Sequence, residues 1–543
     1  MTIMGLIYLS SITGVLILLL ISVINRNINA KNFLFFIIFS GLLILSAFHS
    51  LSNNVGTFGK DSSSEYYVIR KTIVNEGFRE IESAFEAALS VSLTIPILLI
   101  ITNMRFISFY NFIYPLFILI DIIIFYRIAK RIFNDEKISF FSTIFYIANY
   151  WILTYSLSML RAGIAYILLH CLYLNILRSK NDQQKHILLV SMLLSIGIIV
   201  SYYSLVIPFI LTLLLTEIVE IKQKRSYAFP ILSISLIVFS FLYLMYYAII
   251  SGQHIIGAFH NLISFYEERY HTKVSLIEPP PQAETSLKVI GQQLKLATFI
   301  TNYLLALANY FLFMKKKYTL SSHRKFFYLS TASLVTFIVT SPSAFVWGII
   351  NFSYYYHWVI ALLISYFIYV VHYSKKATVR GFLKIFLLLV MLINMLNTTF
   401  VTDYLCGLSN SYILDTIWNN SLNLFTMRFS DYYALTFIAH YSEYTKILVD
   451  CDNVAHVYYV LAEYFTLSNK IVTTTTSYHA LSSNPSIVKG VYIYLSNFNV
   501  RTESLYLHMP GVGYGIPLNI SSSLNMTDII YNSCAQIRFG GNI

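Results

Sequence analysis

Two carboxylates, Asp61 and Glu65, stand four residues apart in the polar run DSSSEYY. If this run is helical, the spacing places both side chains on one helix face. Such a pair is suited to deprotonating a hydroxyl group or to holding a divalent cation. The alternative is a solvated loop acid at a helix start, because Asp61 followed by three serines also has the pattern of an N-terminal cap.

Two arginines and a tyrosine lie beside apolar runs. Arg161 opens one run, in SMLRAGIAY, and Arg105 follows another, in TNMRFIS. A guanidinium at a membrane boundary is a planar donor suited to phosphate, but the position also fits an anchor whose head group reaches into water. Tyr202, in the run SYYS, could bind a sugar or a phosphate, or could belong to a belt of interfacial aromatic side chains.

One acid, Asp121, lies in the middle of the apolar run PLFILIDIIIFYRIAK. An ionisable side chain inside a membrane span is a functional candidate by default, and it would suit a transporter or flippase for lipid-linked glycans. The interpretation we favour is a buried acid that accepts a hydrogen bond from a Ser, Tyr or Asn of a neighbouring helix.

The spacing of His, Cys and acidic residues does not favour a metal site. The segment 251–294 holds several of them without the close spacing of a ligand set. Asp450-Cys451-Asp452 has a DxD pattern, for which a turn at a strand end is the better interpretation. We expect no resident metal, and a divalent cation at the Asp61 loop stays open as an alternative.

The composition requires lipid around much of the chain. Of 543 residues, 57% are hydrophobic and 11% are charged, whereas soluble proteins carry about 25% charged residues. A chain of this size could not cover itself with a charged surface. The net charge of +12 does not indicate nucleic acid, because the basic residues form short clusters between apolar runs, as in membrane proteins.

Twelve apolar runs predict transmembrane helices. The run Ala88 to Ile101 is shorter than the roughly 20 residues that a span needs, and we interpret it as a re-entrant or interfacial helix. The predicted spans are 4–24, 33–48, 108–126, 138–156, 161–177, 187–203, 205–219, 229–250, 295–313, 326–341, 354–371 and 382–400.

The distribution of charge predicts the orientation. Six loops hold 21 of the 37 Lys and Arg residues and only 5 of the 25 Asp and Glu residues, so we place them inside. The amino terminus, the loops 49–107 and 251–294 and the tail then face outward, in a multi-pass protein of the plasma membrane. The inside loops are 25–32, 127–137, 178–187, 217–226, 314–325 and 373–384.

We divide the chain into a transmembrane module, 1–400, and a small extracytoplasmic α/β domain, 401–543. The second part holds Cys406, Cys451 and Cys534, among which one disulfide could form, with the pairing open. Asn-x-Ser/Thr sequons agree with an outward position. The predicted strands are 446–449, 471–475, 488–495 and 529–537, with a helix over 454–464, and the sequons begin at Asn397, Asn419, Asn519 and Asn525.

Five runs carry a resemblance when they are taken in order along the chain. They are DSSSEYYVIRKTIVNEGF, SVSLTIPILLIITNM, MLRAGIAY, YIYLSNFNV and IIYNSCAQIRF. Together they resemble an archaeal family of uncharacterised membrane proteins that is grouped with the GT-C glycosyltransferases. The order of the features along the chain also resembles that of GT-C enzymes. It is an outer loop with an early Asp, a short apolar segment, a span ending in a basic cluster, then further spans and an outward tail. The similarity extends, with gaps, from near residue 55 to the end.

The resemblance implies transfer of a sugar from a polyprenyl (dolichyl) phosphate carrier to an acceptor hydroxyl of a glycan or protein at the outer face. By this resemblance Asp61 would be the base toward the acceptor and Glu65 the second catalytic carboxylate. Arg161 would stabilise the charge of the lipid phosphate.

The lipid-phosphate set expected from this resemblance also includes Arg105, Tyr202 and His357. The chain departs from the family at two of them. Tyr202 stands where a His is often found, and His357, in INFSYYYHW, is the basic residue where an Arg is expected. The alternatives left open are a transporter or flippase, a polymerase for lipid-linked glycans, and a non-catalytic scaffold that displays the tail.

Overall fold

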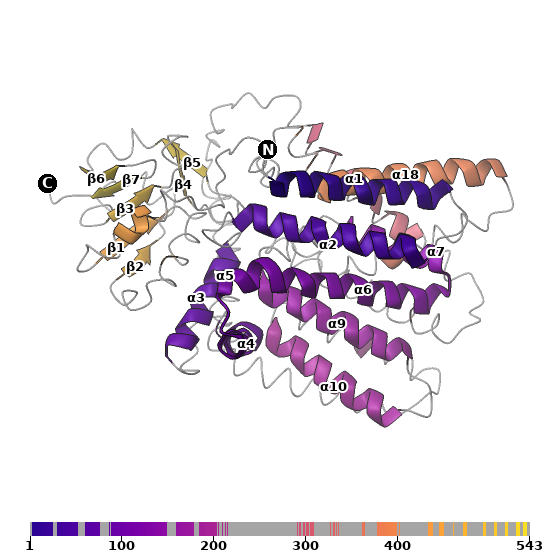
Figure 1. Ribbon diagram of the computed structural model, residues 1–543, viewed down its shortest axis with the longest axis horizontal. Helices are drawn as coiled ribbons and strands as arrows, with labels where there is room; N and C mark the ends of the chain where they lie inside the picture. Colours follow the sequence, from indigo (N-terminus) through magenta and orange to yellow (C-terminus); the bar gives the residue numbers. More distant parts are fainter. Residues whose placement is uncertain are drawn as a thin grey trace, which may run out of the picture.

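The computed structural model of the chain combines a helical bundle with a β-sheet (Figure 1). It describes the amino-terminal part almost continuously and the remainder in shorter stretches. The described residues are 3–24, 30–52, 60–75, 86, 88–148, 159–178, 184–202, 361–363, 377–398, 433–437, 445–449, 471–474, 492–495, 504–507, 516–519, 528–532 and 536–539, with single residues or short stretches between 205 and 215, 290 and 308, and 326 and 335, and at 401, 405 and 460.

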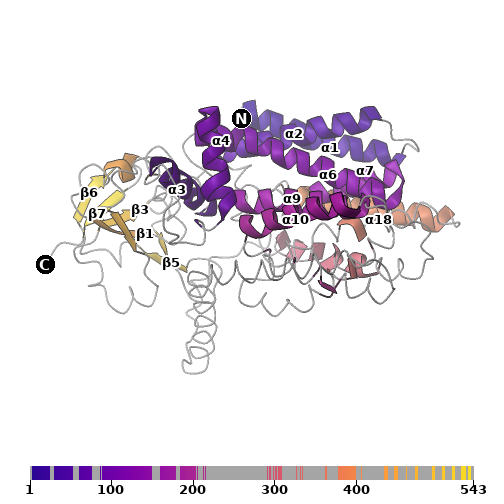
Figure 2. The same ribbon diagram turned by 90° about the horizontal axis from the view of Figure 1, so that it is seen from below.

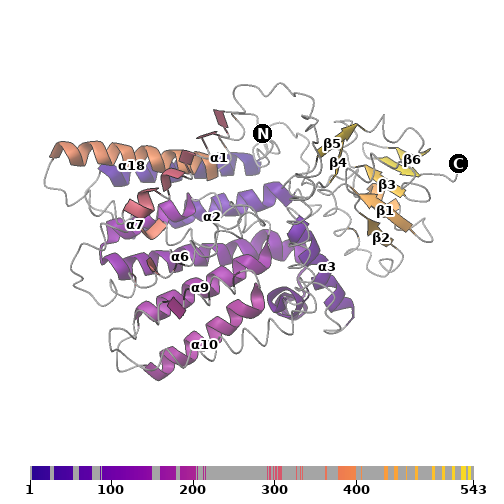
Figure 3. The same cartoon turned by 180° about the vertical axis from the view of Figure 1, so that it is seen from behind.

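Long apolar helices lie side by side and form the bundle (Figures 1 and 3). Several of them match a predicted span to within about five residues at each end. The helix over 114–133, however, begins and ends six to seven residues after the span predicted over 108–126, and the helix over 136–147 ends nine residues before the span predicted over 138–156 does. The passage of each helix through a bilayer, and the total of twelve spans, stay predictions. The helices are α1 (Ile3–Ile24), α2 (Ala30–Ser52), α6 (Tyr114–Phe133), α7 (Glu136–Ile147), α9 (Leu160–Arg178), α10 (Gln184–Ser201) and α18 (Ala377–Thr398).

Two helices in the described part of the chain are long and apolar enough to cross a membrane, by length and composition. They are Phe106–Phe133, with a mean hydropathy of 2.1, and Leu160–Leu177, with 1.6. Shorter apolar helices stand beside them, and many of their large side chains are exposed, such as Leu193 at 62% and Phe382 at 72%. Water covers apolar surface at a cost in free energy, so these faces fit a lipid environment.

The basic cluster that begins at Arg127 differs from the prediction, because most of it lies within α6. We expected a loop over 127–137, but α6 continues to Phe133, and α7 begins at Glu136. Asn134, with a φ of 51°, ends α6 in the left-handed conformation that Asn tolerates, and Asp135 caps α7 by accepting from the Ile138 amide at 3.0 Å. Cations in the last turn of a helix interact favourably with its dipole, which lets the helix extend beyond its apolar part.

One end of the bundle is built differently from the rest. Here lie α3 (Lys60–Val74), the π-helical turn η1 (Ser90–Thr94) and α4 (Ile95–Thr102). The bundle helices run roughly in the plane of Figure 1, whereas α4 is seen end-on and crosses their ends, as Figure 2 confirms. An interfacial helix takes such a crosswise course, and the interpretation of 88–101 as a re-entrant or interfacial helix stays a prediction.

Between α4 and the bundle the chain turns back through two short segments. Asn103, with a φ of 49°, ends α4, and α5 (Phe106–Ser108) follows. The π-helical turn η2 (Phe109–Ile113) then leads directly into α6. The two π turns were not predicted; such turns insert an extra residue in a helix and are frequent at functional sites.

A five-stranded sheet lies beyond α3, at this same end of the bundle (Figures 1–3). Its order is β2-β1-β3-β7-β6, with β1 parallel to β2 and β3, and β7 antiparallel to β3 and β6. A separate antiparallel pair joins β4 and β5. The strands are β1 (Thr445–Val449), β2 (Ile471–Thr474), β3 (Tyr492–Leu495), β4 (Ser504–Leu507), β5 (Ile516–Asn519), β6 (Asp528–Asn532) and β7 (Gln536–Phe539).

The predicted strands match β1 and β2 closely, and β3 is shorter than expected. The single strand predicted over 529–537 is wrong, because the chain forms β6 and β7 there, an antiparallel pair. Asn532 and Ser533, residue types that favour turns, could have signalled the break. The strands β4 and β5 were missed, since Pro517 within the second of them argues against a strand. The domain boundary at 400 and 401 stays a prediction.

Two smaller expectations concern Asn and Cys residues. The sequon at Asn397 lies inside α18, where the side chain is 5% exposed and donates to the Thr298 hydroxyl at 3.2 Å, so it is not a surface acceptor for glycans. Cys171 carries a free thiol within α9. The other three cysteines, the helix predicted over 454–464 apart from Val460, and the Asp450-Cys451-Asp452 turn lie outside the described residues.

Candidate functional site

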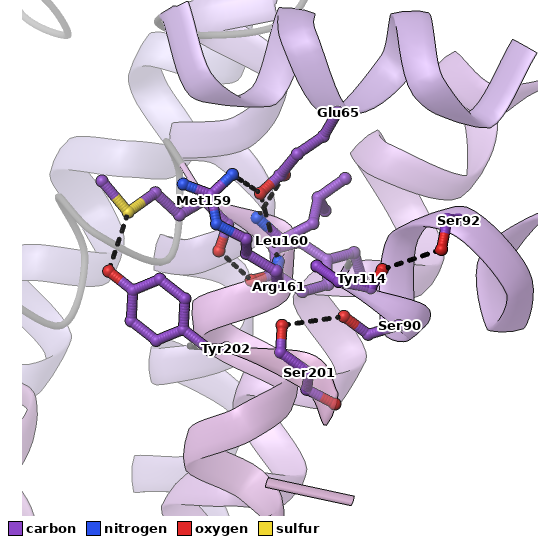
Figure 4. Close-up of polar contacts among 10 residues, drawn as sticks. Glu65, Ser90, Ser92, Tyr114, Met159, Leu160, Arg161, Ser201 and Tyr202 are labelled. Atoms are coloured by element: carbon purple, nitrogen blue, oxygen red, sulfur yellow. Dashed lines mark hydrogen bonds and ion pairs between the residues drawn. The ribbon is translucent and has the colours of Figure 1, made fainter. Parts of the chain in front are cut away.

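Glu65 lies in α3 with its carboxylate fully buried against the start of α9. Oε2 accepts a hydrogen bond from the Leu160 amide at 2.8 Å, and Oε1 accepts one from the Arg161 amide at 3.4 Å. The first amides of a helix have no partner within the helix, and they carry its positive dipole end. Glu65 therefore acts as an N-terminal cap supplied by a different helix (Figure 4).

The same carboxylate holds the side chain of Arg161. The guanidinium Nη1 donates to Glu65 Oε1 at 3.1 Å, and the Arg161 side chain is only 4% exposed. Its Cζ lies 5.6 Å from the centroid of the Tyr202 ring, within the range of a cation–π contact. The Tyr202 hydroxyl in turn donates to Met159 Sδ at 3.8 Å. Three predicted site residues, from α3, α9 and the end of α10, thus meet at one point.

Two further contacts hold the elements around this point. Tyr114, the first residue of α6, donates from its hydroxyl to the Met159 carbonyl at 3.3 Å. Ser90, in η1, donates to the Ser201 carbonyl at the end of α10 at 3.4 Å. The helix starts of α6 and α9, the last turn of α10 and the π turn η1 therefore converge at the site (Figure 4).

Two further contacts hold α3 in the part of the helix that follows Glu65. The Tyr66 ring stacks on the Phe106 ring of α5, with centroids 4.4 Å apart. Lys71, further along α3, forms an ion pair with Glu86 at 2.7 Å, and both side chains are largely buried. The segment between α2 and α4 therefore presents a fixed helix to the bundle over these residues.

The buried geometry decides between several sequence-based interpretations. A solvated loop acid is wrong for Glu65, which is fully buried. A snorkelling anchor is wrong for Arg161, because its guanidinium pairs with Glu65 at 4% exposure. An exposed belt aromatic is wrong for Tyr202, which is 5% exposed. Removing one partner of a buried ion pair costs about 3–5 kcal/mol of stability, so this contact is a strong link between α3 and α9.

The other predicted site residues are placed as follows. The backbone of Asp61 lies in the first turn of α3, which begins at Lys60, one helical turn before Glu65. Arg105 precedes α5 with an extended backbone and an exposed side chain, next to Phe106 beneath α3. His357 lies outside the described residues. The roles of Asp61, Glu65, Arg161, Arg105, Tyr202 and His357 in catalysis or phosphate binding stay predictions.

A second polar group lies deeper, between α6, α7 and α9. Asp121 Oδ2 accepts from the Tyr146 hydroxyl at 2.6 Å, and Oδ1 lies 2.7 Å from His170 Nδ1. Phe125 stacks on Tyr146, and all these side chains are buried. The expected hydrogen bond from a neighbouring Tyr is confirmed. His170 was missed, although an ionisable residue within a span is the same signal that marked Asp121.

In the described part of the chain no three His, Cys, Asp or Glu residues stand close enough to hold a metal ion. The segment 251–288, with His254, His260, Glu267, Glu268 and His271, lies outside that part. The ion pair at the site joins the carboxylate of Glu65 and the guanidinium of Arg161, and the exposed Arg105 precedes α5.

The comparison with solved structures finds likenesses in fold at low sequence identity. The chain is similar to the crystal structure of ArnT from Cupriavidus metallidurans bound to undecaprenyl phosphate, at a TM-score of 0.42 and 10% sequence identity, over 94% of this chain and 98% of that one. No protein-family model matches the sequence. No curated protein matches it either. A likeness at this TM-score and identity carries no argument about a shared site or activity.

Proposed function

We propose that the chain is a membrane glycosyltransferase of the GT-C type. It moves a sugar from a polyprenyl-phosphate carrier to the hydroxyl of a glycan or protein acceptor at the outer membrane face. The observation that carries the proposal is the meeting of Glu65, Arg161 and Tyr202 from three separate helices, one turn from Asp61 on α3.

The surroundings of this point support a lipid-linked donor. The crosswise helix α4 exposes Ile97, Ile100 and Ile101 at 47%, 61% and 76%, and the exposed Arg105 follows its end. An apolar helix face beside a cation suits a donor that carries both a hydrocarbon chain and a phosphate. The sheet lies at the same end of the bundle, which suits an acceptor that approaches from the outer side (Figure 2).

The proposed reaction needs one base and one stabilising cation. The acceptor hydroxyl oxygen forms a bond to the anomeric carbon of the sugar while the bond from that carbon to the phosphate oxygen breaks. The hydroxyl proton passes to the carboxylate of Asp61. The bonding electron pair leaves with the polyprenyl phosphate, and Arg161 offsets the negative charge that develops on it.

The transporter alternative would use Asp121, but its contacts favour a different role. Both carboxylate oxygens have partners at 2.6 and 2.7 Å, and the side chain is 7% exposed. A closed hydrogen-bonded group of this kind is typical of a structural acid within a bundle. This geometry supports the transferase over the transporter.

The first prediction tests the base. In membranes supplied with a radiolabelled polyprenyl-phosphate sugar, Asp61→Asn should lower the rate of sugar transfer by about 10²- to 10⁴-fold, the usual contribution of a general base. The measurement is label incorporated into the acceptor fraction per unit of protein.

The matched control is Asp135→Asn, at the other end of α6. Asn caps a helix about as well as Asp does, so the cap of α7 and the transfer rate should both be preserved. Equal transfer by wild type and Asp61→Asn would reject the assigned mechanism. A wild-type rate no higher than that of membranes lacking the protein would reject the transferase itself.

A further inference from the structure

Both oxygens of the Glu65 carboxylate are occupied by hydrogen bonds within the protein, whereas a general base needs an oxygen that the substrate can reach. The two Glu65 oxygens accept from the Leu160 amide at 2.8 Å, the Arg161 amide at 3.4 Å and Arg161 Nη1 at 3.1 Å. The side chain is 0% exposed. A substrate hydroxyl could reach these oxygens only if the start of α9 moved away.

Protonation of Glu65 would also remove the charge on which these contacts depend. The neutral acid would lose the charge that pairs with the Arg161 guanidinium and would weaken the bonds to the positive end of α9. A general base must accept a proton during the reaction. The surroundings of Glu65 oppose that step, whereas they favour a permanently ionised side chain.

The contacts of Glu65 instead connect two parts of the proposed active site. Asp61 lies one turn before Glu65 on the same helix. Arg161, at the start of α9, contacts the Glu65 carboxylate and the Tyr202 ring. The contacts of Glu65 therefore set the distance between Asp61 on α3 and the guanidinium of Arg161 on α9.

We propose that Glu65 is a positioning residue that fixes Arg161 and the start of α9 relative to Asp61. This inference rests on the proposed function in one respect, namely that the guanidinium placed by Glu65 binds the donor phosphate. The link between α3 and α9 itself stands on the contacts alone. Glu65 thus orients the phosphate-binding cation and takes no proton from the acceptor.

The consequence is tested by the kinetics of Glu65→Gln in the labelled-transfer assay. A hydrogen bond to a charged group contributes enough affinity that its loss should raise the KM for the polyprenyl-phosphate sugar about 10- to 100-fold, with a smaller fall in kcat. Glu65→Asp keeps the negative charge on a shorter side chain, so its KM should lie between those of wild type and Glu65→Gln. A fall in kcat of about 10³-fold at unchanged KM, with loss of the acidic limb of the pH–rate profile, would show a catalytic base and overturn the proposal.

Glu136→Gln is the matched control, because Glu136 also pairs with a cation, Lys130 at 2.7 Å, but is exposed at the other end of the bundle. Its KM and kcat should remain within about twofold of wild type, since exposed ion pairs contribute little.

The link is tested separately, by the thermal unfolding midpoints of Glu65→Gln, Arg161→Met and the double variant in detergent. Each single change removes one charge of the buried pair and keeps the other. The unfolding midpoint of the double variant should therefore fall by less than the sum of the two single decreases. Strict additivity would overturn the link, whatever the transferase assay shows. If wild type transfers no sugar while the unfolding midpoints are coupled, the proposed function fails and the link between α3 and α9 stands.

Discussion

Gly163 is the residue whose size most directly sets the distance between α6 and α9. A Cβ atom at this position would overlap the hydroxyl of Tyr114 and lie 2.9 Å from its Cζ. Tyr114 is fully buried, and its hydroxyl donates to the Met159 carbonyl just before α9. The absence of a side chain at position 163 thus lets the tyrosine reach the backbone that carries Arg161.

The Gly163→Ala variant should therefore be destabilised by about 1–3 kcal/mol, the usual cost of forcing extra atoms into a packed site. Adding Tyr114→Phe should recover part of that loss, because the overlapping hydroxyl is removed. Thermal unfolding in detergent measures both effects. Gly381→Ala on α18 is the control, since nothing lies within 4 Å of the added Cβ, and its midpoint should be unchanged or raised. Equal behaviour of the two alanine variants would contradict this account of α6 and α9.

The helices α6, α7 and α9 are held together by the buried group around Asp121. Each contributes one polar side chain, with Tyr146 on α7 and His170 on α9. A buried carboxylate is costly unless each of its oxygens has a partner, and both oxygens of Asp121 have one. Because Arg161 lies on α9 as well, this group also fixes the helix that carries the candidate site.

A double-mutant cycle between Asp121→Asn and Tyr146→Phe measures that connection. The coupling free energy should be about 1.5–3 kcal/mol, the range for a hydrogen bond to a charged group. Ser142→Ala, also on α7, is the control, because the Ser142 hydroxyl donates to the Ile138 carbonyl of its own helix at 2.8 Å. That variant should add independently to Asp121→Asn. A coupling near zero for Tyr146 would show that the hydrogen bond contributes nothing to stability.

The sequence predicts elements with a strong period or composition, and it predicts contacts poorly. The bounds of α1, α9 and α18 follow from apolar runs. Arg161 is a candidate because it opens such a run, and Glu65 because it stands four residues after Asp61. The pairing between them joins positions 96 residues apart, which no local pattern encodes. The same holds for Asp121 and His170, 49 residues apart.

Backbone irregularities were also beyond prediction. The π turns η1 and η2 change the direction of side chains by inserting a residue in a helix, and their sequences, SVSLT and FYNFI, contain no Pro or Gly to mark them. The turn η1 packs against α3 and α9, and η2 packs against α2 and α5. Sequence patterns therefore indicate candidate residues, while the folded arrangement decides what each of them contacts.

The molecule as a whole has two unlike ends. One end carries α3, α4, the candidate site and the sheet (Figure 3), whereas the other carries Lys130, Arg131 and the exposed Glu136 at the turn between α6 and α7. The helix α6, of 20 residues, separates these ends by about 30 Å, the thickness of the hydrocarbon core of a bilayer. The basic end should face the cytoplasm, because Lys and Arg are retained on that side.

Single cysteines at the two ends test this orientation, in a background in which the 4 native cysteines are replaced by serine. Val74, at the end of α3, is 41% exposed, and the side chain of Glu136 is 58% exposed, so both positions are open to a reagent. A membrane-impermeant maleimide should label Val74→Cys on intact cells and Glu136→Cys only after permeabilisation. Labelling of Glu136→Cys alone on intact cells would invert the topology and move the site to the inner face, where the proposed reaction would meet cytoplasmic acceptors. Equal labelling of both positions on intact cells would mean that α6 does not cross the bilayer.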